Sequence, residues 1–254
     1  MKRLDGKRGL VVGIANAQSI ATGCADAFAA EGARLAVTYL NDRALPHVRP
    51  QADAVGAEIV MPLDVTREGE MDALFDAIAK RWGGLDFLLH SIAYCPRVDL
   101  HGRVVDCSAE GFAQALDVSC HSFLRMARRA EPLMQEGGSL ITVSYYGAEK
   151  VVDNYNIMGP VKAALEAATR HTAVELGPQG IRANVISPGP IATRAASGIG
   201  GFDSLIADAQ TRAPGRRLVS IDEVGEVAAF LASDGASGVT GTVTQIDAGR
   251  HARM

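Results

Sequence analysis

Short runs of β-branched and aliphatic residues alternate along the whole chain with longer alanine-rich segments whose apolar positions recur at helical spacing. The short runs are typical of buried strands, and the longer segments are typical of amphipathic helices that cover a sheet. Strands are predicted at residues 8–14, 33–39, 57–63, 85–91, 139–144, 181–187 and 242–247. This alternation predicts an α/β fold, namely a Rossmann-like, doubly wound, seven-stranded parallel sheet with helices on both faces.

One long interval departs from this regular alternation. Residues 188–220 contain glycines and prolines that interrupt a short helical pattern between the sixth strand and a helix expected from about Ile221. Connections of this length in compact folds often cover a ligand, so we predict a substrate-binding lid here. Because no repeat, low-complexity stretch or linker interrupts the rest, we expect a single domain over residues 1–254.

Composition narrows the classes of partner. The 254 residues are 48% hydrophobic, and the net charge of -4 gives no electrostatic footprint for nucleic acid. No apolar run approaches the roughly 18 residues of a membrane span, and the start has no signal-peptide pattern, so we expect a soluble cytoplasmic protein. The cysteines lack C-x-x-C spacing and the histidines lack paired spacing, which predicts reduced thiols and no metal site. The cysteines are Cys24, Cys95, Cys107 and Cys120.

A loop rich in small residues follows the first predicted strand and runs into a helix. Gly13 would let the chain turn tightly, Ser19 can cap the helix, and Gly23 would let helix and sheet approach closely. The amides of Ser19 and Ile20 would then face a pyrophosphate at the positive end of the helix. The loop is not G-x-G-x-x-G, and a turn of this composition can also be purely structural.

The ends of the next strands supply further candidates for a dinucleotide site. Asp64 and Val65 close the third strand, and Ser91 and Ile92 close the fourth, where ligands bind in open α/β sheets. Asp64 could take an adenine amino group, or it could simply cap the segment before Thr66. No basic residue immediately follows the second strand, which favours NADH, although NADPH is not excluded.

Tyr155 and Lys162 are the strongest chemical signal in the chain. If the segment after Asn156 is helical, their separation of seven residues places the phenol and the ammonium on one stripe, about 10 Å apart. A tyrosine that donates to a carbonyl beside a lysine that holds a cofactor ribose is a recurring arrangement for hydride transfer. Tyr146 and Lys150 form a tighter pair of the kind found in ketoreductases, but a shared helical face is not expected there, since the pair follows a strand through Gly147.

The chain resembles the enoyl-acyl-carrier-protein reductases of type II fatty acid synthesis, within the short-chain dehydrogenase/reductase superfamily. The resemblance rests on Tyr145, on the Tyr155-x6-Lys162 spacing, on S-I-A at residues 19–21, and on P-G-P-I-A-T-R-A-A-S-G-I from Pro188 onward. It extends from Gly6 to about Asp247. It implies reduction of the C2=C3 bond of a trans-2-enoyl thioester by NADH.

The resemblance also implies roles for individual residues. Tyr155 would donate to the thioester oxygen, Lys162 would hold the nicotinamide ribose, and Tyr145 would line the acyl pocket. Cys95 would touch the substrate, and a loop after the sixth strand would lie over the nicotinamide. The cofactor contacts implied in that loop and after the second strand are Leu40, Ile191, Ala192, Thr193, Arg194 and Ala195.

Partners and departures follow from the same comparison. The resemblance implies an acyl carrier protein as the bearer of the substrate and a homotetramer as the assembly. Arg194, Arg212, Arg216 and Arg217 flank the predicted lid and could steer an acidic carrier. Leu40 and the Asp247-Ala248-Gly249-Arg250 tail depart from the family pattern, which usually has a polar residue at the first site and a second glycine and an aromatic in the tail. The alternatives are a 3-ketoacyl thioester reductase and a non-catalytic dinucleotide sensor.

Overall fold

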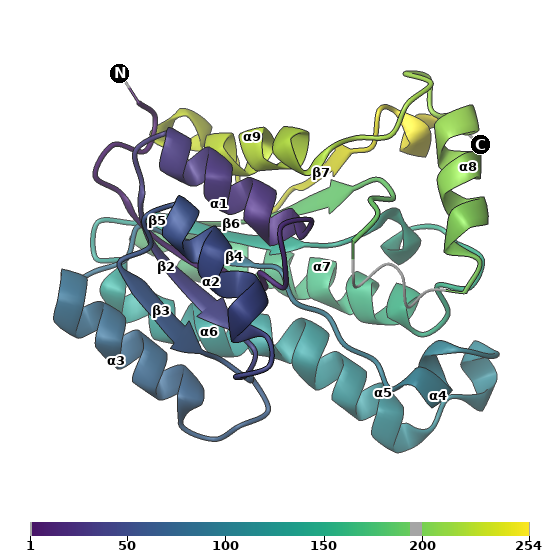
Figure 1. Ribbon diagram of the computed structural model, residues 1–254, viewed down its shortest axis with the longest axis horizontal. Helices are drawn as coiled ribbons and strands as arrows, with labels where there is room; N and C mark the ends of the chain where they lie inside the picture. Colours follow the sequence, from purple (N-terminus) through teal and green to yellow (C-terminus); the bar gives the residue numbers. More distant parts are fainter. Residues whose placement is uncertain (1, 194–199, 254) are drawn as a thin grey trace.

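Seven parallel strands form the centre of the molecule. The computed structural model describes residues 2–193 and 200–253, and the sheet has the order β3-β2-β1-β4-β5-β6-β7 (Figure 1). The predicted seven-stranded, doubly wound parallel sheet is therefore confirmed, with strand ends within a few residues of those expected. The strands are β1 Arg8–Val12, β2 Arg34–Tyr39, β3 Ile59–Pro62, β4 Phe87–His90, β5 Gly138–Val143, β6 Ile181–Pro188 and β7 Val243–Ile246.

Helices cover both faces of this sheet because their apolar sides need a partner surface. On one face α1, α2 and α9 bury a core with the sheet, and on the other face α3, α6 and α7 bury a second core (Figure 1). The helices are α1 Ile20–Ala30, α2 Leu45–Ala54, α3 Glu70–Trp82, α4 Arg97–Leu100, α5 Ala109–Leu116, α6 Ser122–Ala130, α7 Met158–Leu176, α8 Phe202–Arg212 and α9 Ile221–Ala232. Across residues 2–193 and 200–253, none of these helices has the length and apolar character that crossing a membrane requires.

Close packing of α1 on α9 depends on two glycines. A Cβ built on Gly23 would lie 2.3 Å from the carbonyl oxygen of Ile221, and one built on Gly225 would lie 2.2 Å from the carbonyl oxygen of Gly23. The expectation that Gly23 serves helix-to-sheet contact was therefore wrong, because the neighbour that requires the missing side chain is another helix.

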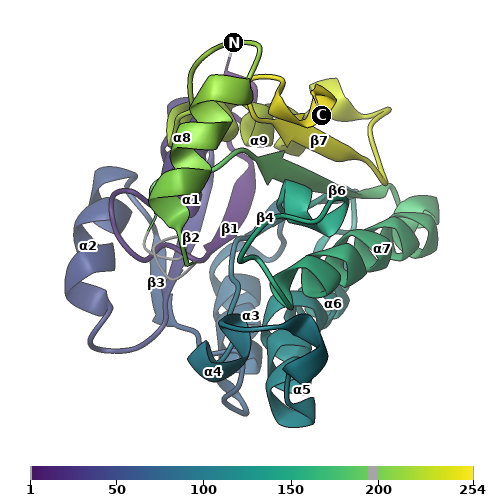
Figure 2. The same ribbon diagram turned by 90° about the vertical axis from the view of Figure 1, so that its right-hand side faces the viewer.

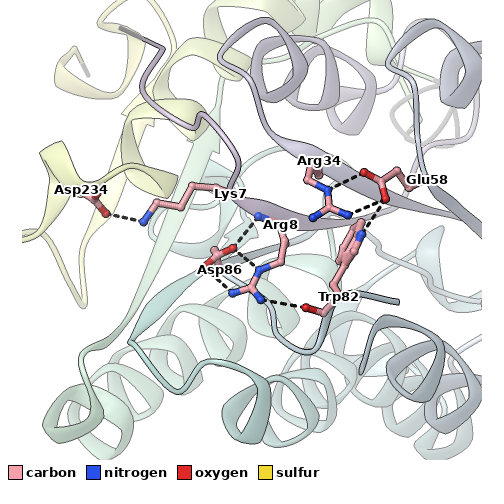
Figure 3. A network of polar contacts seen from close by, with 7 residues as sticks. All are labelled: Lys7, Arg8, Arg34, Glu58, Trp82, Asp86 and Asp234. Carbon is pink, nitrogen blue, oxygen red and sulfur yellow. Dashed lines mark hydrogen bonds and ion pairs between the residues drawn. The ribbon is translucent and has the colours of Figure 1, made fainter. Parts of the chain in front are cut away.

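Ion pairs join the strands at the amino edge of the sheet (Figure 3). Arg8, which opens β1, donates through Nε to Asp86 Oδ2 at 2.7 Å and through Nη2 to Asp86 Oδ1 at 3.0 Å. Arg34, which opens β2, donates to both carboxylate oxygens of Glu58, and the Trp82 indole donates to the same carboxylate at 3.0 Å. These contacts fix neighbouring strands in register at the amino edge of the sheet, opposite its carboxyl edge.

The carboxyl edge of the sheet is where chemistry is expected. The chain runs outward from β1 to β3, then returns to β4 beside β1 and continues outward on the other side. Loops on the two sides therefore diverge between β1 and β4, and such a crevice is the usual ligand site of open α/β sheets. Figure 2 looks toward this end of the molecule, where α8 and α4 flank the strand ends.

Candidate active site

A largely apolar cavity of about 330 Å³ opens at the carboxyl edge of the sheet. The first residue of α1 and the loops after β4, β5 and β6 contribute to it, together with the start of α7 and one residue of α8. Its lining residues are Ile20, Ser91, Ile92, Ala93, Tyr94, Cys95, Leu100, Val143, Ser144, Tyr145, Tyr155, Met158, Lys162, Pro188, Gly189, Pro190, Ile191, Thr193 and Leu205.

The structure thus brings many of the predicted site residues to one cavity. Those that line it are Ile20, Ser91, Ile92, Cys95, Tyr145, Tyr155, Lys162, Ile191 and Thr193. Those placed elsewhere along the same edge are Gly13, Ser19, Leu40, Asp64, Val65 and Ala192. Arg194 and Ala195 lie outside the described residues. Sequence reasoning missed Ser144 and Met158, although each directly precedes or begins a segment that it had identified.

Tyr155 reaches the cavity from a turn, so the predicted single helical stripe was wrong. Helix α7 begins only at Met158, and the turn before it holds Asn154 at φ 62° and Asn156 at φ 45°. Asparagine tolerates this left-handed conformation, and a right-handed helix cannot continue through a residue that adopts it. Gly147 makes room for the ring, since a Cβ there would lie 2.4 Å from Tyr155 Cδ1. Tertiary packing rather than helical periodicity therefore aims the phenol at the cavity beside Lys162.

Two tyrosine rings meet edge to face in the cavity wall. The ring centroids of Tyr145 and Tyr155 are 4.9 Å apart at an interplanar angle of 65°. Burial raises the pKa of Tyr145 to about 12, and burial together with the neighbouring Tyr145 raises the pKa of Tyr155 further. Both phenols are therefore neutral hydrogen-bond donors at physiological pH. The Tyr145 hydroxyl is buried and has no hydrogen-bond partner within the described part of the chain.

Lys162 is a buried cation in the first turns of α7. Its side chain donates from Nζ to the carbonyl oxygen of Val143 at 2.6 Å, and the residue is 5% exposed. Burial lowers the pKa of Lys162 to about 8, while Cys120 and Glu166 oppose that shift. An ammonium has three N–H donors, so the bond to Val143 leaves two for a ligand.

Ser144 and Glu166 form a polar pair beside Lys162. The Ser144 hydroxyl donates to Glu166 Oε1 at 2.6 Å, and Glu166 lies one helical turn after Lys162. Burial raises the pKa of Glu166, and the Ser144 hydrogen bond opposes that rise. The spacing of four residues between Lys162 and Glu166 is the signal that could have placed Glu166 near the site from the sequence.

The glycine-rich loop after β1 has the required tight turn but not the predicted cap. Gly13 has φ 115°, and a Cβ there would lie 2.0 Å from the carbonyl oxygen of Ser91. Ser19 precedes α1, yet its hydroxyl accepts the amides of Ala15 and Asn16 at 3.0 Å each, with no bond to the helix. Its own amide donates to the Asn16 carbonyl at 3.1 Å. The expectation that the Ser19 side chain caps α1 was therefore wrong, while the contact of the Ser19 and Ile20 amides with a pyrophosphate stays a prediction.

Asp64 stabilises its own loop. Its Oδ1 accepts the amide of Thr66 at 3.0 Å and the hydroxyl of Thr66 at 2.7 Å, which is an Asx turn, and α3 starts only at Glu70. This turn explains the presence of a carboxylate at position 64 without a contact to adenine. Val65 is buried next to it, and Leu40 at the end of β2 is 54% exposed. Their predicted cofactor contacts stay predictions.

The residues present fit a dinucleotide whose nicotinamide end reaches the cavity. A buried ammonium with spare donors and a buried Tyr145 hydroxyl that has no hydrogen-bond partner among residues 2–193 and 200–253 both point to a polar ligand. Both residues line the cavity at the carboxyl edge of the sheet. Tyr146 and Lys150 line a different hollow, together with Asp208 and Arg250, which sets that pair apart from Lys162.

Comparisons with known proteins show the family of this chain. The family model described as "Enoyl-(Acyl carrier protein) reductase" matches residues 13–251. The chain belongs to this family. It is 48% identical over 248 residues to "Enoyl-[acyl-carrier-protein] reductase [NADH] 1" of Rhizobium meliloti, which covers 98% of this chain and 91% of the relative.

Solved structures of other enoyl-acyl-carrier-protein reductases have the same fold. The Anaplasma phagocytophilum reductase in complex with NAD is 44% identical with a TM-score of 0.94, covering 98% of this chain and 95% of that one. The Bacillus cereus reductase with NADP+ and an indole naphthyridinone is 43% identical with a TM-score of 0.97, covering all of both chains. The family predicted from the Tyr155 and Lys162 motif is thereby confirmed.

Two of the arginines near α8 are paired with carboxylates, whereas within the described part of the chain Arg216 donates only to the carbonyl oxygen of Thr211. Arg212 pairs through Nε with Asp208 at 2.6 Å, and Arg217 pairs with Glu223 through two bonds of 2.6 and 2.7 Å. Arg194 lies outside the described residues. Two of the four arginines predicted to steer a carrier are thus neutralised locally, which weakens that hypothesis.

Proposed function

We propose that this chain catalyses NADH-dependent reduction of the C2=C3 bond of trans-2-enoyl-acyl-carrier-protein thioesters in fatty acid synthesis. The observation that carries the proposal is the convergence of Tyr145, Tyr155 and Lys162 on one apolar cavity in a member of the enoyl reductase family. A protein that only binds a dinucleotide would need neither the neutral phenols nor their placement beside a buried cation.

Tyr155 is the proposed donor to the substrate. Hydride addition at C3 of the enoyl group puts negative charge on the thioester oxygen, which then needs a hydrogen-bond donor. Because burial raises the pKa of Tyr155, its hydroxyl keeps its proton and can donate throughout the physiological range. Tyr145 packs against it and presents a second buried hydroxyl, whose proposed role is to orient the thioester.

Lys162 is proposed to hold the nicotinamide ribose. The bound dinucleotide would supply the hydride for the reaction. The N–H groups of Lys162 that do not bond Val143 can donate to sugar hydroxyls, and the ammonium adds positive potential near the thioester oxygen. Since the pKa of Lys162 is about 8, most of these ammonium groups are charged at pH 7.

Apolar residues complete the proposed acyl site. Met158 and Leu205 line the cavity from α7 and α8, and Cys95 and Ile191 line it from the loops after β4 and β6. Such walls suit an enoyl chain and exclude water from the reacting carbons. We propose that the chain is a single dinucleotide-binding domain in which the segment around residues 188–220 covers the substrate. Within this segment, Ile191, Ala192 and Thr193 are proposed to contact the cofactor.

NADH is the proposed cofactor. The curated relatives carry NADH in their names, and one similar structure holds NAD while another holds NADP+. Leu40 at the end of β2 offers neither a carboxylate for a ribose hydroxyl nor a cation for a 2′-phosphate. This chain should therefore discriminate less strongly against NADPH than a chain with an acidic side chain at position 40 would.

We also propose an acyl carrier protein as the bearer of the substrate, a homotetrameric assembly and a cytoplasmic location. The exposed side of α7 supports an interface, because it carries partly exposed alanines such as Ala163 and Ala167 beside a Val174 that is 77% exposed. Phe112 and Leu124 on the neighbouring α5 and α6 are also exposed. Small residues on a helix allow the close approach of a second helix.

The test is oxidation of NADH by purified protein with a trans-2-enoyl thioester, beside an acetoacetyl thioester and beside NADPH. We expect turnover of the enoyl substrate alone, and a fall of about 100- to 1,000-fold in kcat for Tyr155→Phe, which removes one preorganised donor. Tyr146→Phe is the matched control, since Tyr146 lines the other hollow. Turnover of the ketoacyl substrate alone would make the chain a ketoreductase, and cofactor binding without turnover would make it a sensor.

A further inference from the structure

Asp208 on α8 receives two arginines at once. Arg212, one turn later on the same helix, approaches Asp208 Oδ1 through Nε at 2.6 Å. Arg250, in the short turn after β7, donates through Nη2 to Asp208 Oδ2 at 3.0 Å. Leu205, one turn before Asp208 on α8, lines the acyl cavity. The same helix therefore touches the substrate region at one residue and the C-terminal segment at another. Figure 1 shows α8 beside the end of the chain.

Arg250 differs from Arg212 in its surroundings. The Arg212 side chain is 58% exposed, as in an ordinary surface pair, whereas the Arg250 side chain is only 13% exposed. The Arg250 guanidinium carbon lies 5.8 Å from the centre of the Tyr146 ring, within the range of a cation–π contact. A covered guanidinium that joins a carboxylate and an aromatic ring is geometrically specific, while an exposed pair is weak and adaptable.

The turn that carries Arg250 is itself fixed. Asp247 is buried, and its two carboxylate oxygens accept the amides of Gly249 and His251 at 3.0 and 2.7 Å. The Ala248 carbonyl accepts the amide of Gly215, which lies in the connection after α8. Arg250 therefore projects from a rigid base toward α8.

Tyr146 connects this contact to the reaction site. It directly follows Tyr145, whose hydroxyl is buried in the cavity wall. The positive charge of Arg250 lowers the pKa of Tyr145 and the negative charge of Asp208 raises it, so both groups lie within electrostatic reach of that phenol. Arg250 thus contacts two elements that each contribute a residue to the lining of the same cavity, namely Leu205 from α8 and Tyr145 from the segment after β5.

We propose that Arg250 is a positioning residue that holds α8 against the Tyr145–Tyr146 segment and thereby sets the width of the acyl site at Leu205. The consequence for the reaction rests on the proposed function. The mechanical part, that Arg250 holds α8 in place, does not.

The kinetic test compares Arg250→Ala with Arg212→Ala, which removes the other partner of the same carboxylate from an exposed site. Substrates are trans-2-enoyl coenzyme A thioesters of short and long acyl chain. For Arg250→Ala we expect the KM for the thioester to rise about tenfold, with a changed ratio between short and long chains and an unchanged KM for NADH. Arg212→Ala should change each constant less than about twofold. Equal effects of the two variants, or a parallel loss of NADH binding, would overturn the proposal.

A second readout needs no activity. Hydrogen exchange of the α8 amides should become about tenfold faster in Arg250→Ala than in the wild type, while the α7 amides keep their rate. Asp208→Asn, which keeps the side-chain shape, should reproduce this signature, and Arg250→Lys should restore only part of the protection because it lacks the planar fork. Unchanged α8 exchange in both Arg250→Ala and Asp208→Asn would refute the positioning role. If α8 loosens as expected but wild-type protein reduces no enoyl thioester, the proposed function fails and the positioning role stands.

Discussion

Lys162 should make the stability of this protein depend on pH in a direction opposite to that of an exposed ion pair. Its ammonium is buried and donates to the Val143 carbonyl, and burial lowers the pKa of Lys162 from 10.5 to about 8. At about 1.4 kcal/mol per pH unit, this difference corresponds to about 3 kcal/mol. The perturbation that isolates it is Lys162→Met, which keeps the length of the side chain and removes the charge.

The sign follows from proton binding in the two states. Below pH 8 the lysine is charged in both the native and the unfolded protein, so the native state bears the full cost of a buried cation. Between about pH 8 and 10.5 the native lysine is already neutral while the unfolded lysine still holds its proton. The unfolded state then binds more protons, and the free energy of unfolding of the wild type rises with pH. Relative to Lys162→Met, it should rise by about 3 kcal/mol across this window.

The assay is urea unfolding of the cofactor-free protein, followed by circular dichroism at fixed protein concentration from pH 7 to pH 10.5. Tyrosine titration occurs in both proteins and cancels in the difference. Lys80→Met on the exposed side of α3 is the matched control, and its curve should parallel that of the wild type. If the free energy of unfolding of Lys162→Met also changes with pH in parallel with that of the wild type, burial of the Lys162 ammonium does not cost the free energy that its geometry predicts.

Two further changes test the backbone of the site and of the tail. Gly13→Ala would place a Cβ 2.0 Å from the Ser91 carbonyl at φ 115°, so it should cost more than about 3 kcal/mol and abolish NADH binding in a fluorescence titration. Gly56→Ala, with φ 62° but open space around it, should cost only about 1 kcal/mol, and equal costs would contradict the clash. Ala248→Gly should raise the free energy of unfolding by about 0.5–1 kcal/mol, because Ala248 sits at φ 55°, whereas Ala79→Gly within α3 should lower it by about 1 kcal/mol. A loss of stability in Ala248→Gly would show that contacts of the alanine methyl outweigh the backbone strain.

The arrangement of strands and helices was predictable from the sequence because it depends on local periodicity. Short β-branched runs between alanine-rich amphipathic segments leave few alternatives to a doubly wound parallel sheet, and the predicted strands agree with β1 to β7. The residues at the strand ends were predictable for the same reason. In a parallel sheet all carboxyl ends meet at one edge, so Ser91, Tyr145 and Ile191 had to lie near one another once the strands were placed.

Roles that depend on neighbours distant in the sequence were not predictable. Gly23 was assigned to the sheet, but its close neighbour is Ile221 of α9. Ser19 shows that even local partners can be ambiguous, because its hydroxyl accepts amides three and four residues before it and none from the helix that follows. A hydroxyl can bond several nearby backbone groups and a glycine can serve several kinds of close contact, so only the surrounding packing decides which partner each one has.

The sequence alone determined the fold class and, through the spacing of Tyr155 and Lys162 together with its flanking motifs, the family. Tertiary structure alone decided how those residues meet. The left-handed Asn154 and Asn156 keep α7 from extending back to Tyr155. The absence of a side chain at Gly147 leaves room for the Tyr155 ring to point toward the cavity. It also decided that Lys162 is buried against Val143 and that Arg250 reaches Asp208 on α8. Periodicity is a property of neighbouring residues and survives in the one-dimensional sequence, whereas burial and charge contacts arise between segments that only folding brings together.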